Sequence, residues 1–134
     1  KNLVFELTES VLINSADKAV KLIKELNASG IKVSMDDFGT GYSSLSYIYQ
    51  FDFNELKIDK SFTDLIGCSR KTDDFIKILI DTCHKFGIQV VTEGVENEQQ
   101  YKKLLDDGCD IIQGYYFSRP VDEKCMIEML ASND

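Results

Sequence analysis

The chain of 134 residues contains no tryptophan, one proline and one histidine, and its few metal-binding side chains exclude some classes of protein. Its four cysteines have no C-x-x-C spacing, and His84 alone cannot complete a zinc site, so a zinc finger is excluded. No apolar run approaches the roughly 18 residues of a membrane span. Scattered cysteines are typical of a reducing compartment, so we expect a cytoplasmic protein without direct membrane contact through this segment.

Positive charge is also scarce. Fifteen Lys and Arg residues stand against 23 Asp and Glu residues, which gives a formal net charge of −8. A domain that binds a nucleic-acid polymer through charge needs the opposite sign, so we expect no such partner. An anionic ligand would therefore need another source of positive charge, for which a bound divalent metal is the obvious candidate.

What the sequence does contain is a β-rich run followed by a helical stretch, repeated five times. The predicted strands cover residues 3–8, 32–36, 55–59, 89–93 and 110–115. The predicted helices cover residues 17–27, 44–49, 72–86, 98–107 and 122–131. Strands that alternate with helices in this way are typical of parallel β-α-β units, and they place the chain in the α/β class.

Each predicted strand has one apolar side, and its other side ends in a polar group. Side chains alternate across a strand, so Val33 and Met35 share one face while Asp36 faces the other way. The polar groups near the carboxyl ends are Glu6, Asp36, Lys57, Glu93 and Gln113. An α/β barrel presents such groups at its carboxyl rim, where active sites lie. An open doubly wound sheet would bury them under helices. We therefore predict a TIM-like (β/α) barrel.

The predicted barrel is partial. A closed (β/α)₈ barrel typically needs about 250 residues, so five βα units cannot close one. We expect residues 1–134 to be the carboxyl-terminal part of one larger domain. The strand at residues 3–8 would then be an unpaired apolar edge. Such an edge favours a homodimer or association with the missing amino-terminal part.

Four carboxylates would meet at the predicted rim: Glu6, Asp36, Asp37 and Glu93. Crowded carboxylates repel one another, and a hard cation such as Mg²⁺ or Mn²⁺ relieves the repulsion. Two such ions about 3.5–4 Å apart are used in phosphoryl transfer, and one of the adjacent carboxylates at 36 and 37 could bridge them while the other holds the second ion. Lys57 could orient a metal-bound water or balance phosphate charge. Alternatively, residues 36–39 are an ordinary exit from a strand, with glycine supplying a positive φ.

Five segments of the sequence resemble the EAL family of bacterial cyclic di-GMP phosphodiesterases. They follow the family's order along the chain: FELTES at 5–10, MDDFGTGYSSL at 35–45, LKIDKSF at 56–62, TEGVE at 92–96 and QGYYFSRP at 113–120. The resemblance implies an EAL barrel with a two-metal centre of Mg²⁺ or Mn²⁺. It also implies a hydrolase that converts cyclic di-GMP to linear pGpG in bacterial second-messenger signal transduction.

The resemblance implies roles for individual residues as well. Glu6 and Asp36 would bind the first metal, with Asp36 bridging, and Asp37 and Glu93 would complete the second site. Lys57 would hold the nucleophilic water, and Glu93 has also been cast as a general base. We thus expect Lys57, Glu93, Asp36 and Asp37 to be catalytic. The residues expected to bind substrate or support the loop at 38–45 are Glu9, Gly39, Thr40, Gly41, Tyr42 and Gln113.

The resemblance also has a gap. The family's Glu-x-Leu signature and a metal-binding Asn would both lie upstream of residue 1, so the first metal site is expected to be incomplete. We therefore expect the isolated chain to be weakly active or inactive, although the parent would be an enzyme. Segments upstream could tether that parent to a membrane. A non-catalytic cyclic di-GMP receptor or protein-interaction module is the alternative. Degenerate members lose acids at the metal site, whereas all four acids are present here.

Overall fold

The computed structural model describes residues 3–8, 11, 16–39 and 46–131, and it contains one parallel sheet. Its strands are β1 (Val4–Thr8), β2 (Lys32–Phe38), β3 (Glu55–Ile58), β4 (Gln89–Thr92) and β5 (Ile111–Ile112). The strands pair in chain order from β1 to β5, and every pair is parallel. An order that never reverses is that of an α/β barrel, because a doubly wound sheet reverses its order at the ligand-binding crevice.

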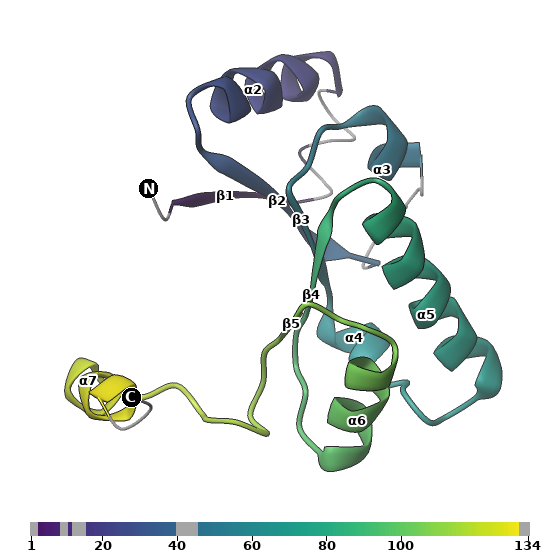
Figure 1. Ribbon diagram of the computed structural model, residues 1–134, viewed down its shortest axis with the longest axis vertical. Helices are drawn as coiled ribbons and strands as arrows, with labels where there is room; N and C mark the ends of the chain where they lie inside the picture. The colour runs from purple at the N-terminus through teal and green to yellow at the C-terminus, as the bar shows by residue number, and fades with distance from the viewer. Residues whose placement is uncertain (1–2, 9–10, 12–15, 40–45, 132–134) are drawn as a thin grey trace.

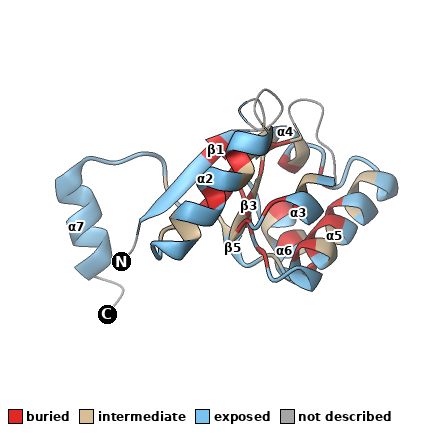
Figure 2. Ribbon diagram, turned by 90° about the horizontal axis from the view of Figure 1, so that it is seen from above, coloured by how far each residue is buried: buried red, intermediate tan, exposed pale blue. Residues whose placement is uncertain are grey.

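The helices lie mainly on one side of this sheet. They are α2 (Ala16–Ala28), α3 (Ser46–Gln50), α4 (Lys60–Thr63), α5 (Arg70–Lys85), α6 (Glu98–Asp106) and α7 (Glu123–Ala131). Figure 1 shows α3, α5 and α6 along one side of the strands, while α7 is set apart. Figure 2 shows α7 exposed throughout, and none of its residues is buried. The described helices include none that is long and apolar enough to cross a bilayer.

The core lies between the sheet and its helices. Val33 and Met35 of β2 and Leu56 and Ile58 of β3 are fully buried, as the alternation predicts. They share one cluster with Ile23 of α2 and with Ile76, Leu79 and Ile80 of α5. Because β1 is an edge strand, its apolar side is only partly covered. Phe5 on this strand remains 42% exposed.

Two elements differ from the sequence-based expectations. Helix α4 was not predicted, and it begins where Asp59 Oδ1 accepts a hydrogen bond from Ser61 N–H at 2.9 Å. Strand β5 has two residues instead of the predicted six. Beyond β5, Gly114 packs against the backbone of Val95, where an added Cβ would lie 2.1 Å from Val95 O. This close approach replaces further regular pairing.

The end of β2 is irregular, and this irregularity affects the two adjacent aspartates. The register between β2 and β3 shifts between Met35 and Phe38. Asp37 has a φ of 56°, in the left-handed region that Asp tolerates better than most residues. A bulge of this kind re-aims side chains. The strict alternation that would send Asp36 and Asp37 to opposite faces therefore no longer applies.

Candidate functional site

The side chain of Lys57 joins three of the predicted site residues. Its Nζ lies 2.7 Å from Glu93 Oε1 and 3.1 Å from both Asp36 Oδ1 and Glu6 Oε1. These groups come from β1, β2, β3 and the residue that follows β4, so neighbouring strands each contribute one side chain at their carboxyl ends. Three carboxylates around one ammonium leave this edge of the sheet with a net negative charge.

The contacts of Lys57 fix its protonation state. Its side chain is only 12% exposed, and burial by itself lowers the pKa of an ammonium group. Hydrogen bonds to Glu93, Asp36 and Glu6 outweigh burial and hold the pKa of Lys57 well above its ordinary value. Lys57 is therefore a fixed positive charge at neutral pH. Its three N–H donors are directed at carboxylates, and it cannot act as a general base.

Asp37 belongs to the same electrostatic group. Burial raises the pKa of its carboxyl, and the negative charges of Asp36, Asp59 and Glu93 raise it further. The sequence reasoning missed Asp59, although it continues the alternation of Glu55 and Lys57 along β3. Hydrogen bonding from Ser61 lowers the pKa of Asp59 itself, so Asp59 is a lasting negative charge beside Asp37.

The possible metal-ligand atoms in this group suit a hard divalent cation, because all of them are carboxylate oxygens. Their arrangement does not reproduce the predicted two-metal centre. In the part of the chain that the structure describes, no three His, Cys, Asp or Glu side chains are grouped so that they could hold a metal ion. Glu6, Asp36 and Glu93 instead direct oxygens at Lys57 Nζ. The residues thus fit a cation in their chemistry, while the geometry gathers them on an ammonium.

Gln113, which directly follows β5, shares a cavity with Glu93. The cavity has a volume of about 250 Å³. Its lining consists of Lys60, Glu93, Gly94, Glu96, Gln113, Gly114 and Tyr115. The backbone of Gln113 is held on both sides, since its N–H donates to Thr92 O at 2.9 Å and its carbonyl accepts from Val95 N–H at 3.1 Å. Gln113 and Glu93 therefore meet at the carboxyl edge of β4 and β5.

The remaining predicted residues belong to the loop after β2 and its anchor. Gly39 has a φ of +107°, and a Cβ at this position would lie 1.8 Å from the ring of Phe62, so both the backbone angle and the packing require glycine. Glu9, Thr40, Gly41 and Tyr42 lie outside the described residues. Their assignment to substrate binding and loop support stays a prediction.

Two buried polar residues behind Glu93 also escaped the sequence reasoning. Thr63 Oγ1 donates a hydrogen bond to Glu93 O, and Gln100 Nε2 donates one to Thr63 O. Gln100 forms a capping box with Asn97, and that N-x-x-Q spacing is visible in the sequence. Thr63 carries no comparable signal, because nothing in the sequence places it near Glu93.

Comparison with known proteins assigns the chain to a family. The family model described as EAL domain matches residues 1–120. The chain belongs to the EAL domain family. It is 38% identical over 128 residues to the cyclic di-GMP phosphodiesterase NbdA of Pseudomonas aeruginosa, an alignment that covers 96% of this chain and 16% of NbdA. The EAL chain spans between 14% and 18% of the length of three curated relatives that it matches.

Solved structures agree with this assignment. The EAL domain of Mycobacterium smegmatis DcpA is 36% identical with a TM-score of 0.87, and the match covers 96% of this chain and 58% of that one. BlrP1 of Klebsiella pneumoniae, described as a manganese/cy-diGMP complex, is 35% identical with a TM-score of 0.81. That match covers 87% of this chain and 30% of BlrP1. The predicted family and the predicted partial (β/α) barrel are thereby confirmed.

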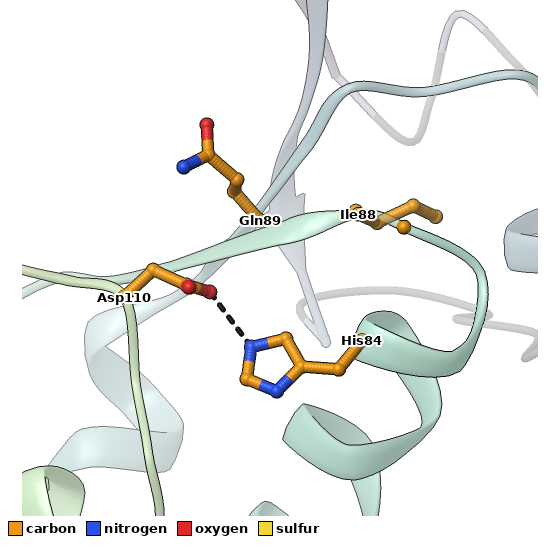
Figure 3. A pocket seen from close by; sticks show the side chains of 5 residues that line it. His84, Ile88, Gln89 and Asp110 are labelled. Atoms are coloured by element: carbon orange, nitrogen blue, oxygen red, sulfur yellow. Dashed lines mark hydrogen bonds and ion pairs between the residues drawn. The ribbon is translucent and has the colours of Figure 1, made fainter.

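A second cavity of the EAL chain lies at the opposite, amino ends of β4 and β5. It has a volume of about 290 Å³ and contains His84, Gln89 and Asp110 in its wall, as Figure 3 shows. Asp110 Oδ2 lies 2.8 Å from His84 Nε2 and accepts a hydrogen bond from Val90 N–H, also at 2.8 Å. Burial raises the pKa of Asp110, but these hydrogen bonds outweigh it and lower the pKa. The contacts tie α5 to the sheet, which is a structural role.

Proposed function

We propose that the EAL chain is part of a metal-dependent phosphodiesterase that hydrolyses cyclic di-GMP to linear pGpG. The observation that carries this proposal is the fixed ammonium of Lys57 within 3.1 Å of Glu6, Asp36 and Glu93 at the carboxyl edge of a parallel sheet. The carboxyl edge is where α/β barrels carry their active sites. The name of NbdA and the cy-diGMP complex of BlrP1 support the choice of substrate.

Each residue has a proposed part in this reaction. Glu6, Asp36, Asp37 and Glu93 would hold Mg²⁺ or Mn²⁺, with Asp36 bridging, together with ligands from the rest of the domain. Bound metal would supply the positive field that an acidic chain lacks and would lower the pKa of a bound water. Lys57, which stays protonated, would donate hydrogen bonds to that water or to a phosphate oxygen.

Glu93 would have a second part in the reaction, and the remaining residues would position the substrate. The Glu93 carboxylate would accept a proton from the water, as a general base. Gln113 would support the site from the far side of the cavity that it shares with Glu93. The loop-support and substrate-binding residues would be Glu9, Gly39, Thr40, Gly41 and Tyr42.

The decisive experiment measures metal-dependent turnover. The protein that carries this chain is incubated with cyclic di-GMP and Mn²⁺, and pGpG is followed by chromatography with and without a chelator. We expect hydrolysis that the chelator abolishes and that Asp36→Ala reduces by at least about a thousandfold, the scale of losing an essential electrostatic contribution. Asp81→Ala, an exposed acid on α5, serves as the matched control. Turnover near the wild-type rate in the Asp36→Ala protein would refute the assignment.

A non-catalytic cyclic di-GMP receptor is the second candidate. It is favoured by the convergence of three carboxylates on Lys57, because the ammonium binds all three and compensates one of their charges without a metal. Calorimetry that finds tight nucleotide binding in the presence of chelator, together with no hydrolysis in Mn²⁺, would establish it.

We propose that the protein works in the cytoplasm and associates through the edge of its sheet. The apolar side chains of Val4 and Phe5 on edge strand β1 are exposed, which favours pairing with a second copy or with another part of the same domain. Light scattering that finds a monodisperse monomer of the 134-residue chain at moderate concentration would contradict self-association.

A further inference from the structure

A buried polar network lies behind the segment that carries Glu93. Thr63 is fully buried at the end of α4, and its Oγ1 donates a hydrogen bond to Glu93 O at 2.6 Å. Gln100 is 6% exposed in the first turn of α6, and its Nε2 donates a hydrogen bond to Thr63 O at 3.1 Å. Hydrogen bonds therefore run without a break from α6 through α4 to the backbone of Glu93.

The side-chain amide of Gln100 also holds the residues that follow Glu93. Its Oε1 accepts hydrogen bonds from Glu96 N–H at 2.8 Å and from Asn97 N–H at 3.2 Å. Asn97 Oδ1 accepts in return from Gln100 N–H at 3.0 Å, which completes the capping box. One amide group thus fixes both ends of segment 93–97, through Thr63 at its start and directly at its end.

The carbonyl contact matters because of the backbone geometry at Glu93. On one side, Glu93 N–H donates to Ile58 O at 3.0 Å and continues the pairing of β4 with β3. On the other side, Gly94 has a φ of +71°, so the chain turns away directly after Glu93. The hydrogen bond from Thr63 holds the peptide group at this turn. The orientation of this peptide group affects the position of the Glu93 carboxylate, which lies 2.7 Å from Lys57 Nζ.

We propose that Thr63 and Gln100 are positioning residues that hold the Glu93 carboxylate in place beside Lys57. Neither residue lines the cavity next to Glu93. Thr63 acts through the backbone carbonyl of Glu93, and Gln100 acts through Thr63 and through the backbone of Glu96 and Asn97. Misplacing a catalytic group by about 1 Å can cost about a hundredfold in rate, which is why such support matters. The effect on turnover rests on the proposed function, whereas the effect on segment 93–97 does not.

The first test measures backbone amide exchange in peptides that cover residues 93–97, by mass spectrometry on the metal-free protein. Thr63→Val keeps the shape of the side chain and removes the donor, so we expect about tenfold faster exchange, the scale of one lost hydrogen bond. Thr63→Ser keeps the donor and should exchange at nearly the wild-type rate. Thr82→Val is the matched control, because Thr82 Oγ1 donates to Ile78 O within α5, away from the site.

The second test measures turnover of cyclic di-GMP with Mn²⁺, well below the melting midpoint. We expect Thr63→Val to lower kcat about tenfold or more with KM within about twofold, and Thr63→Ser to restore kcat. A purely structural role would lower the melting midpoint and leave kcat unchanged. That result, or wild-type exchange at 93–97 in Thr63→Val, would overturn the proposal.

Two further comparisons cover a Thr63→Val protein that does not fold and a wild-type protein that shows no turnover. If Thr63→Val does not fold, Gln100→Glu replaces it, because this variant keeps the acceptor for Glu96 and Asn97 and removes the donor to Thr63. If the wild-type protein does not hydrolyse cyclic di-GMP, the proposed function fails. The exchange comparison still decides whether Thr63 and Gln100 hold the segment that carries Glu93.

Discussion

Replacing Lys57 by methionine tests whether the site is organised around one ammonium group. The substitution keeps an unbranched side chain of similar length and removes the charge. Glu6, Asp36 and Glu93 then lose a partner within 3.1 Å. They are left to repel one another beside Asp37, whose pKa is already raised by burial and by the charges of Asp36 and Glu93. We therefore expect a loss of stability that a surface lysine would not produce.

The expected loss follows from burial. Removing one partner of a fully buried ion pair costs about 3–5 kcal/mol. The Lys57 side chain is 12% exposed, but the three carboxylates are 20% to 49% exposed and therefore remain partly solvated. We accordingly expect a loss of about 2 kcal/mol, with Asp36 and Glu93 contributing most. For a domain of this size, that loss lowers the melting midpoint by about 8 °C.

The assay is urea unfolding of the metal-free protein, with Lys77→Met as the matched control. Lys77 pairs with Asp81 on the surface of α5, so its replacement should cost only about 0.5 kcal/mol. Because the folded pKa of Lys57 is raised, its contribution is complete below the unfolded value of 10.5 and is lost only as pH rises through the higher folded pKa. The difference between the two variants should thus persist throughout the neutral range. Equal losses in both variants would refute the reasoning.

Three further predictions concern single residues. Asp37→Asn should raise the free energy of unfolding at pH 7, measured in urea. The folded pKa of Asp37 is raised, so ionised Asp37 destabilises the fold, increasingly as pH rises from 3.8 through the folded pKa. Equal stability of the two proteins at pH 7 would contradict this. Gly114→Ala should cost about 1–3 kcal/mol in a thermal melt, since its Cβ would lie 2.1 Å from Val95 O; an unchanged midpoint would show that the segment yields. Asp110→Ala should cost about 1–3 kcal/mol with kcat unchanged, because Val90 N–H loses its acceptor. The folded pKa of Asp110 is lowered, so this difference should shrink as pH falls below 3.8 towards that pKa, and a constant difference would rule the explanation out.

Much of the fold could be predicted from the sequence, because the alternation of strands and helices is a local pattern. The strands at β2 and β3 and the helices α2, α5 and α6 lie within a few residues of their predicted bounds. Parity along the strands also identified the side chains at the carboxyl edge, and Lys57 does contact Glu6, Asp36 and Glu93. These predictions rest on the side-chain periods of 2.0 residues in strands and 3.6 residues in helices, which can be read from the sequence directly.

The rest of the site could not be predicted, because it depends on contacts between distant segments. The left-handed backbone of Asp37 arises at a register shift against β3, which the sequence of β2 alone does not reveal. Thr63 contacts Glu93 across 30 positions of sequence. The early end of β5 follows from the packing of Gly114 against Val95. Local propensity describes none of these contacts.

We expect the acidic edge of the sheet to serve binding rather than folding. Lys57 compensates one of the charges around it, and the raised pKa of Asp37 means that the fold disfavours its ionised form. An edge selected for stability alone would gain from a neutral side chain in place of Asp37. Groups with perturbed pKa values cluster at functional sites, and an arriving cation would relieve the repulsion at this edge. Mn²⁺ should accordingly raise the melting midpoint of the wild-type protein more than that of Asp37→Asn. Equal shifts would separate the acidic edge from metal binding.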